Sequence, residues 1–81
     1  MYYVYIARLR SGKFYTGFTA DLRERIKRHQ RKNPTKTTAK DPIKELVFYC
    51  AFVDIQQAID FEKYLKSSSG NAFRNKRLLP T

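Results

Sequence analysis

The sequence predicts an α+β fold: a small three-stranded antiparallel β-sheet flanked by helices, in the order ββαβαα. Segments 2–9, 13–18 and 43–53 are rich in β-branched and aromatic residues, as strands are. Segments 22–30 and 55–66 carry apolar residues at helical spacing. The chain has 81 residues, which is enough for one domain with one core. A sheet of this size has to be packed against helices to bury an apolar face.

The first two strands form a hairpin, and its loop length decides how two tyrosines are arranged. A three-residue loop, Arg10 to Gly12, pairs position 5 with position 17 and places Tyr5 and Tyr15 on one face. A two-residue loop places them on opposite faces. The sequence leaves both alternatives open.

The first helix is expected to follow the hairpin directly. Thr19 or Asp21 can cap it, because either side-chain oxygen can accept a hydrogen bond from a free N–H of the first turn. The helix is predicted to end near Gln30. Residues 31–42 are polar and form a long loop, and loops of this length are often functional.

The third strand contains a continuous apolar run and is predicted to be largely buried, with its Cys50 as inert core. Asp54 caps a second helix that runs to about Lys66. The stretch from Ser67 to Gly70 is predicted to end that helix, and residues 71–79 form a short last helix.

The charge balance indicates a polyanionic partner. Seventeen Lys and Arg stand against seven Asp and Glu, giving a net charge of +10. Apolar runs are too short for a membrane span, and no signal segment opens the chain, so no membrane partner is expected. A single cysteine excludes an internal disulfide or a cysteine-rich zinc site and favours a cytoplasmic setting.

Charged residues interrupt the apolar stripes of both main helices. Arg25 and His29 fall on the stripe of the first helix, which Leu22 and Ile26 define. In the second helix Glu62 lies amid the stripe formed by Ile55, Ala58, Ile59 and Leu65. A buried charge needs a partner, a ligand or a wet cleft. Two interpretations remain: a structural Arg25–Glu62 salt bridge between the helices, or a catalytic pair.

Five elements in order resemble one enzyme family. Tyr3-Val4-Tyr5 and Tyr15-Thr16-Gly17 lie ten residues apart from tyrosine to tyrosine, and Arg25 follows ten residues later. The segment 58–66 carries Glu62. This arrangement resembles the GIY-YIG nuclease superfamily, in particular its small stand-alone bacterial members. It departs from the pattern at Tyr3, in place of the first glycine, and at Thr16, in place of an aliphatic residue.

The resemblance implies a metal-dependent endonuclease that hydrolyses phosphodiester bonds in DNA at a single-metal site. Glu62 is then the carboxylate ligand of Mg²⁺ or Mn²⁺. Arg25 neutralises charge on the phosphoryl oxygens. Tyr5 or Tyr15 acts as the general base or positions the attacking water, and His29 relays the proton or binds phosphate. The seven acids are too scattered for a two-metal cluster.

The substrate contacts are assigned to basic and small residues. Nucleic-acid binding is predicted at Gly17, Lys27, Arg28, Lys36, Lys40 and Asn75. Asn75 is the candidate for the family's late asparagine and Asn71 its rival. The predicted partner is a nucleic acid, with DNA as the first choice and RNA left open, bound by a monomer or weak dimer. The alternative is a basic DNA- or RNA-binding module of the same fold that cleaves slowly or not at all.

Overall fold

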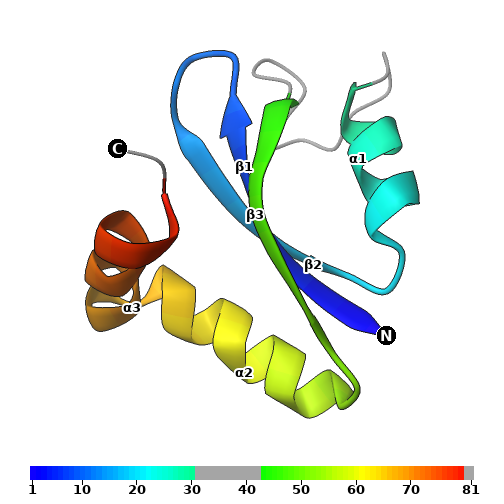
Figure 1. Ribbon diagram of the computed structural model, residues 1–81, viewed down its shortest axis with the longest axis vertical. Helices are drawn as coiled ribbons and strands as arrows, with labels where there is room; N and C mark the ends of the chain where they lie inside the picture. Colours follow the sequence, from blue (N-terminus) through cyan, green and yellow to red (C-terminus); the bar gives the residue numbers. More distant parts are fainter. Residues whose placement is uncertain (31–42, 80–81) are drawn as a thin grey trace.

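The computed structural model describes residues 1–30 and 43–79, and over this part the chain forms one three-stranded antiparallel sheet of order β2-β1-β3, with helices around it (Figure 1). The α+β class is confirmed. The elements are β1 (Tyr2–Leu9), β2 (Phe14–Thr19), α1 (Leu22–Gln30), β3 (Ile43–Phe52), α2 (Ile55–Lys66), α3 (Ser68–Phe73) and the π-helical turn η1 (Arg74–Leu78).

The central strand β1 supplies core residues to both faces of the sheet. Its residues alternate between the faces, and those from Val4 to Ala7 are completely buried. On the face covered by α2, the buried residues are Val4, Ile6, Ala58 and Leu65. On the face covered by α1, they are Tyr5, Ala7, Leu9 and Ile43, with Leu22, Ile26 and Tyr15 packed against them. Figure 1 shows α1 on one side of the sheet and α2 with α3 on the other.

The hairpin has the three-residue loop. Leu9 N–H donates to Lys13 O at 2.8 Å and Gly12 N–H donates to Leu9 O at 2.9 Å. Gly12 has φ of 95°, a left-handed conformation that favours glycine and closes such loops. Position 5 therefore pairs with position 17, and both tyrosines lie on the α1 face.

The prediction that the third strand is largely buried is wrong, because β3 is an edge strand. Ile43 is its buried residue in the structure, and Tyr49 is 55% exposed. A bulge at Val47 lets Ala7 pair with Leu46 directly after Ile6 pairs with Phe48. The extra residue changes the alternation, so the first half of β3 presents a different set of side chains to each face.

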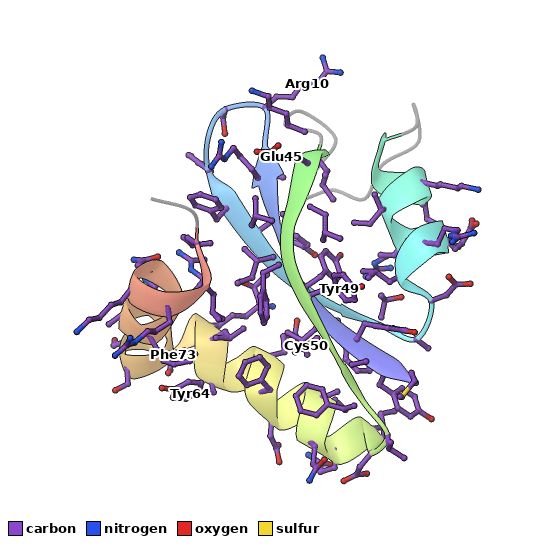
Figure 2. All side chains as sticks on the ribbon, viewed as in Figure 1. Arg10, Glu45, Tyr49, Cys50, Tyr64 and Phe73 are labelled. Carbon is purple, nitrogen blue, oxygen red and sulfur yellow. The ribbon has the colours of Figure 1, made fainter. Side chains whose placement is uncertain are left out.

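Cys50, one residue after Tyr49, points to the opposite side of β3, toward α2 (Figure 2). It is half-buried and packs against the apolar cluster of the α2 face. Burial raises the pKa of the Cys50 thiol, although a backbone hydrogen bond from Val4 partly lowers it. The thiol is therefore neutral at physiological pH, as expected for a packing residue.

The cap predictions are confirmed for both main helices. The Asp21 carboxylate accepts from Glu24 N–H at 3.1 Å, and the Asp54 carboxylate accepts from Gln56 N–H at 3.3 Å. Ile55 follows the cap at the first turn of α2 and is 44% exposed, so its placement in the buried stripe is wrong. The buried residues of α2 are Ala58 and Leu65.

The end of α2 at Lys66 agrees with the prediction, but the start of the last helical segment differs from it. Ser67 alone ends α2 and at the same time caps α3, since its hydroxyl accepts from Gly70 N–H at 3.1 Å. Gly70 lies inside α3, where a Cβ would collide with the Tyr64 carbonyl. The last helical segment therefore begins three residues before the predicted start at residue 71.

Candidate functional site

The hairpin brings Tyr5 and Tyr15 together on the α1 face. Tyr5 pairs with Gly17 in β2, so Tyr15 is its diagonal neighbour, and the ring centroids lie 6.2 Å apart. Tyr5 is fully buried, whereas Tyr15 is half-buried. The two tyrosines that the sequence left interchangeable therefore have different access to solvent.

Gly17 is needed to accommodate Tyr5. A Cβ at Gly17 would collide with Cζ, Oη and Cε1 of the Tyr5 ring. The ring therefore lies across the backbone of β2, and its hydroxyl is held above Gly17. This gives Gly17 a local structural role, and its predicted contact with nucleic acid stays a prediction.

The Tyr5 hydroxyl and Arg25 form the buried polar centre of this face. Tyr5 Oη and Arg25 Nε are both buried, and neither has a partner in strict hydrogen-bond geometry among the described residues, although the Arg25 guanidinium lies close enough to the Tyr5 hydroxyl to interact with it. Burial raises the pKa of Tyr5, and the nearby Arg25 guanidinium lowers it by less. Tyr15 and Glu62 add to the rise. Tyr5 is therefore a neutral phenol at physiological pH.

Glu62 approaches the same centre from α2. Its side chain is 21% exposed, and it is close enough to Tyr5 to affect the Tyr5 pKa. Glu62 pairs with Lys66, with Nζ to Oε2 at 2.9 Å, rather than with Arg25. The structural Arg25–Glu62 salt bridge is therefore not formed. Tyr15, Arg25 and Glu62 nevertheless all lie near enough to Tyr5 to affect its pKa.

A cavity of about 330 Å³ opens beside this group, at the free edge of β2. Tyr15 lines it with Thr16, Lys66, Asn71 and Arg74. Thr16 Oγ1 is buried there without a hydrogen-bond partner in the described part of the chain. Basic and amide side chains around an unused hydroxyl make a polar site that suits an anionic group.

The two candidate asparagines are placed differently. Asn71 lines the cavity with Tyr15, whereas Asn75 is exposed and accepts from the Arg74 guanidinium at 3.1 and 3.2 Å. The geometry favours Asn71, the rival, for a role near Tyr15. Thr16 was noted in the sequence as a departure, but no substrate contact was predicted for it. The sequence signal for Thr16 was its position in β2 between Phe14 and Phe18, which alternate with it on the same face and pack against the core.

The remaining predicted residues lie farther from this centre or outside the description. Lys27 and Arg28 are exposed on α1, and Arg28 approaches Glu24 at 4.0 Å. His29 belongs to α1, but its side chain lies outside the described part, as do Lys36 and Lys40. Among the described helices, none is long and apolar enough to cross a membrane.

Comparison with known proteins agrees with this arrangement. Residues 1–77 match the GIY-YIG catalytic domain family. The chain belongs to the GIY-YIG family. Membership gives a nuclease-type fold and implies nucleic acid as the class of substrate, and the nucleases of this family typically use divalent metals.

The similar proteins are small UPF0213 proteins. One from Pectobacterium carotovorum is 34% identical over 70 residues, covering 86% of this chain and 71% of the relative. Another, from Clostridium perfringens, is 36% identical over 72 residues, covering 88% of this chain and 76% of the relative. The solution NMR structure of a UPF0213 protein from Bacillus halodurans matches with a TM-score of 0.58 and 32% identity, covering 99% of this chain and 89% of that one.

The donor set of this GIY-YIG domain fits one divalent ion held by one carboxylate. No group of three or more His, Cys, Asp or Glu side chains gathers anywhere in residues 1–30 and 43–79. Glu62 is half-buried and is near enough to the Tyr5 hydroxyl to act on it electrostatically. Mg²⁺ is commonly bound through one or two carboxylates while it keeps several waters.

Proposed function

We propose that this GIY-YIG domain is a metal-dependent endonuclease that hydrolyses phosphodiester bonds in DNA. One observation carries the proposal: two buried polar atoms, Tyr5 Oη and Arg25 Nε, lack partners in strict hydrogen-bond geometry in the described structure, and the half-buried carboxylate of Glu62 is near enough to affect the Tyr5 pKa. Unsatisfied buried polar groups cost about 1–3 kcal/mol each. Such groups persist where function requires them.

Glu62 would hold the divalent ion, Mg²⁺ or Mn²⁺. When bound, such an ion supplies Lewis acidity to a phosphoryl oxygen and stabilises the leaving oxygen. Arg25 would bind the phosphoryl oxygens, because a guanidinium remains charged and presents a planar donor fork to them. The exposed Lys27 and Arg28 would bind flanking phosphates.

Tyr15 is the better candidate for the residue that orients or deprotonates the attacking water. It is half-buried and lines the 330 Å³ cavity, so solvent and substrate can reach it. Tyr5 is fully buried with a raised pKa, so it remains protonated. Tyr5 would therefore be a positioning residue that fixes the guanidinium of Arg25, rather than the general base.

A second candidate function is a nucleic-acid-binding module of the same fold that does not cleave. The Lys66–Glu62 ion pair at 2.9 Å favours it, because Lys66 occupies one oxygen of the carboxylate that the metal would need. Cleavage requires that ion to compete with Lys66 for Glu62. The two functions therefore differ in what the ion pair does when divalent metal is added.

Cleavage of end-labelled single-stranded, duplex and branched DNA, with Mg²⁺ or Mn²⁺ and with chelator, tests the proposal. Glu62→Gln removes the charge while keeping the size, and Glu24→Gln is the matched control on an exposed acid of α1. We expect metal-dependent cutting that Glu62→Gln reduces by roughly 100-fold or more and Glu24→Gln leaves unchanged. Melting of each variant checks that it is folded.

A second pair of variants separates the tyrosines. Tyr15→Phe is expected to reduce kcat by about 10²–10⁴-fold, the usual range for a general base, and Tyr5→Phe by less. Cutting that survives Glu62→Gln would refute the assigned site. DNA binding without cutting under any metal condition would establish the binding module instead.

A further inference from the structure

A groove on the α1 face, next to the candidate catalytic group, has no role so far. It has a volume of about 540 Å³ and lies between α1 and the strands β1 and β3. Its apolar surface is formed by Tyr3, Leu22, Ile26, Leu46 and Tyr49. Volumes of this order are typical of small-molecule sites, which begin at roughly 300 Å³, so one base and its sugar can enter.

Tyr49 presents its ring to the groove. It is 55% exposed although it lies in a strand, and Figure 2 shows it projecting from β3 toward α1. The Tyr3 ring stands beside it, with centroids 6.5 Å apart and planes tilted by 56°. One ring therefore supports the other from the side and leaves a face of Tyr49 open. Exposed aromatic faces of this kind are stacking platforms for nucleobases.

The charges around the groove suit a nucleotide strand. Arg23 and Lys27, one turn apart on α1, line the groove and are exposed. Asp21 also lines it, but its carboxylate is used to cap α1 through Glu24 N–H. Two cations that have no ion-pair partner within residues 1–30 and 43–79 can bind a phosphate beside the aromatic platform while the attached base stacks.

The groove adjoins the candidate active site through residues that neighbour Tyr5 and Arg25. Tyr49 is paired directly with Tyr5 across β1 and β3. On α1, Leu22 and Ile26 of the groove lie on either side of Arg25 in the sequence and share its inward face. A strand whose phosphate is held at Arg25 therefore has the groove within reach of a neighbouring nucleotide.

We propose that this groove binds one unpaired nucleobase of the substrate DNA strand, stacked on Tyr49, with its phosphate at Arg23 and Lys27. This rests on the proposed function, since it assumes that the domain binds DNA. A base in a duplex is already stacked and paired, so a duplex cannot fill the groove without losing a base from its stack. The groove thus gives a preference for single-stranded or locally unpaired DNA.

The absence of tryptophan from the chain provides a direct test. Tyr49→Trp introduces one fluorophore in the groove. Tyr64→Trp is its control, because Tyr64 is 43% exposed and lies on α2, on the other side of the sheet (Figure 2). Each variant is titrated with a thymidine oligonucleotide, with an abasic deoxyribose-phosphate oligomer of the same length, and with a duplex. Binding of each of these three nucleic-acid probes is measured in a separate titration by the fluorescence anisotropy of the probe.

We expect the thymidine oligonucleotide to quench the Tyr49→Trp variant, and the abasic oligomer and duplex to leave its emission unchanged. The Tyr64→Trp variant should respond to none of the three. Tyr49→Ala should weaken single-strand binding by roughly 5- to 150-fold, which corresponds to about 1–3 kcal/mol of stacking. Tyr49→Phe should retain binding, and Tyr64→Ala should not change it.

The two proposals fail in different ways. DNA that binds by anisotropy without quenching the Tyr49→Trp variant overturns the stacking site and leaves the nuclease proposal intact. Equal quenching by the abasic oligomer or the duplex also overturns it, because the groove would then not be reading an unpaired base. If the wild-type domain does not bind DNA at all, both the nuclease proposal and the proposed base-binding groove are overturned.

Discussion

On the α2 face of the sheet the completely buried side chains are Val4, Ile6, Ala58 and Leu65, all apolar, whereas on the α1 face the largest is Tyr5, a polar residue without a hydrogen-bond partner in the described structure. The α2 face is thus packed as an ordinary hydrophobic core. The α1 face combines packing with unsatisfied polar atoms.

The polar exception on the α2 face is Thr16, and its position explains the contrast. It belongs to β2, the same edge strand that carries Tyr15 and Gly17, and it lines the cavity at that edge. Polar groups without partners therefore gather around β2 from both faces. The α2 face is therefore the more uniformly apolar of the two, and the buried polar atoms without a partner in the described structure lie on the α1 face and at the β2 edge.

The largest expected loss of stability follows from truncating a buried side chain on the apolar α2 face. Leu65→Ala removes a completely buried side chain from α2, and we expect it to lower the free energy of unfolding by about 2–5 kcal/mol. Leu22→Ala on the α1 face should have a smaller effect, because Leu22 is half-buried. Val53→Ala, at a residue that is 82% exposed, should change stability by no more than about 0.5 kcal/mol. Urea titration measures all three, and equal losses for the two leucines would contradict the comparison.

The next largest loss of stability is expected when the backbone position beneath the Tyr5 ring is changed. Gly17→Ala forces the Tyr5 ring to move, and we expect a loss of about 1–3 kcal/mol of stability. In a Tyr5→Ala background the same change should have little effect, because the ring is gone. Gly12→Ala is the control: it costs about 1 kcal/mol through its positive φ and does not depend on residue 5. A double-mutant cycle in urea measures the coupling, and additive values would exclude the contact.

A smaller effect concerns the unsatisfied hydroxyl at the cavity. Thr16→Val replaces Oγ1 by a methyl group of similar size, and we expect unchanged or slightly higher stability, by at most about 1 kcal/mol. The control, Thr19→Val, should lose about 0.5–1.5 kcal/mol, since the Thr19 hydroxyl accepts from Asp21 N–H at 3.1 Å. Thermal melting decides. A clear loss in Thr16→Val would mean that its hydroxyl is satisfied in solution.

Local sequence signals predicted the secondary-structure elements and the charged residues that face inward from the two main helices. Asp21 and Asp54 cap the helices as expected, because capping depends on residues within one turn. Helical spacing placed Arg25 and Glu62 on the inward faces of α1 and α2, where the structure has them. The resemblance of the two tyrosine motifs identified the family, which residues 1–77 match.

Features that depend on pairing across the sheet could not be predicted in the same way. An apolar run such as β3 is compatible with a central or an edge strand, and the order β2-β1-β3 makes it an edge. The sequence alone left the length of the hairpin loop open, and the left-handed conformation of Gly12 belongs to the three-residue loop that the structure has. The different environments of Tyr5 and Tyr15 follow from this register and from the ring over Gly17, neither of which is a property of the motif.

The smallest expected effect is the pH dependence of stability that the buried Tyr5 causes. Burial raises the pKa of Tyr5 in the folded state, with Tyr15 and Glu62 adding to the rise and Arg25 opposing it, whereas an unfolded tyrosine titrates near pH 10. Between these two values the unfolded state loses a proton that the folded state keeps, so increasing pH favours unfolding. Below pH 10 the folded and unfolded chains hold the same proton, and Tyr5 gives no pH dependence.

We therefore expect wild type to lose more stability than Tyr5→Phe just above pH 10, by less than about 1 kcal/mol within half a pH unit. The matched control Tyr64→Phe, at an exposed tyrosine of α2, should follow wild type in urea titrations at pH 9 and above pH 10. Parallel curves for wild type and Tyr5→Phe would show that the Tyr5 hydroxyl is solvated, and the contrast between the two faces would then lose its strongest example.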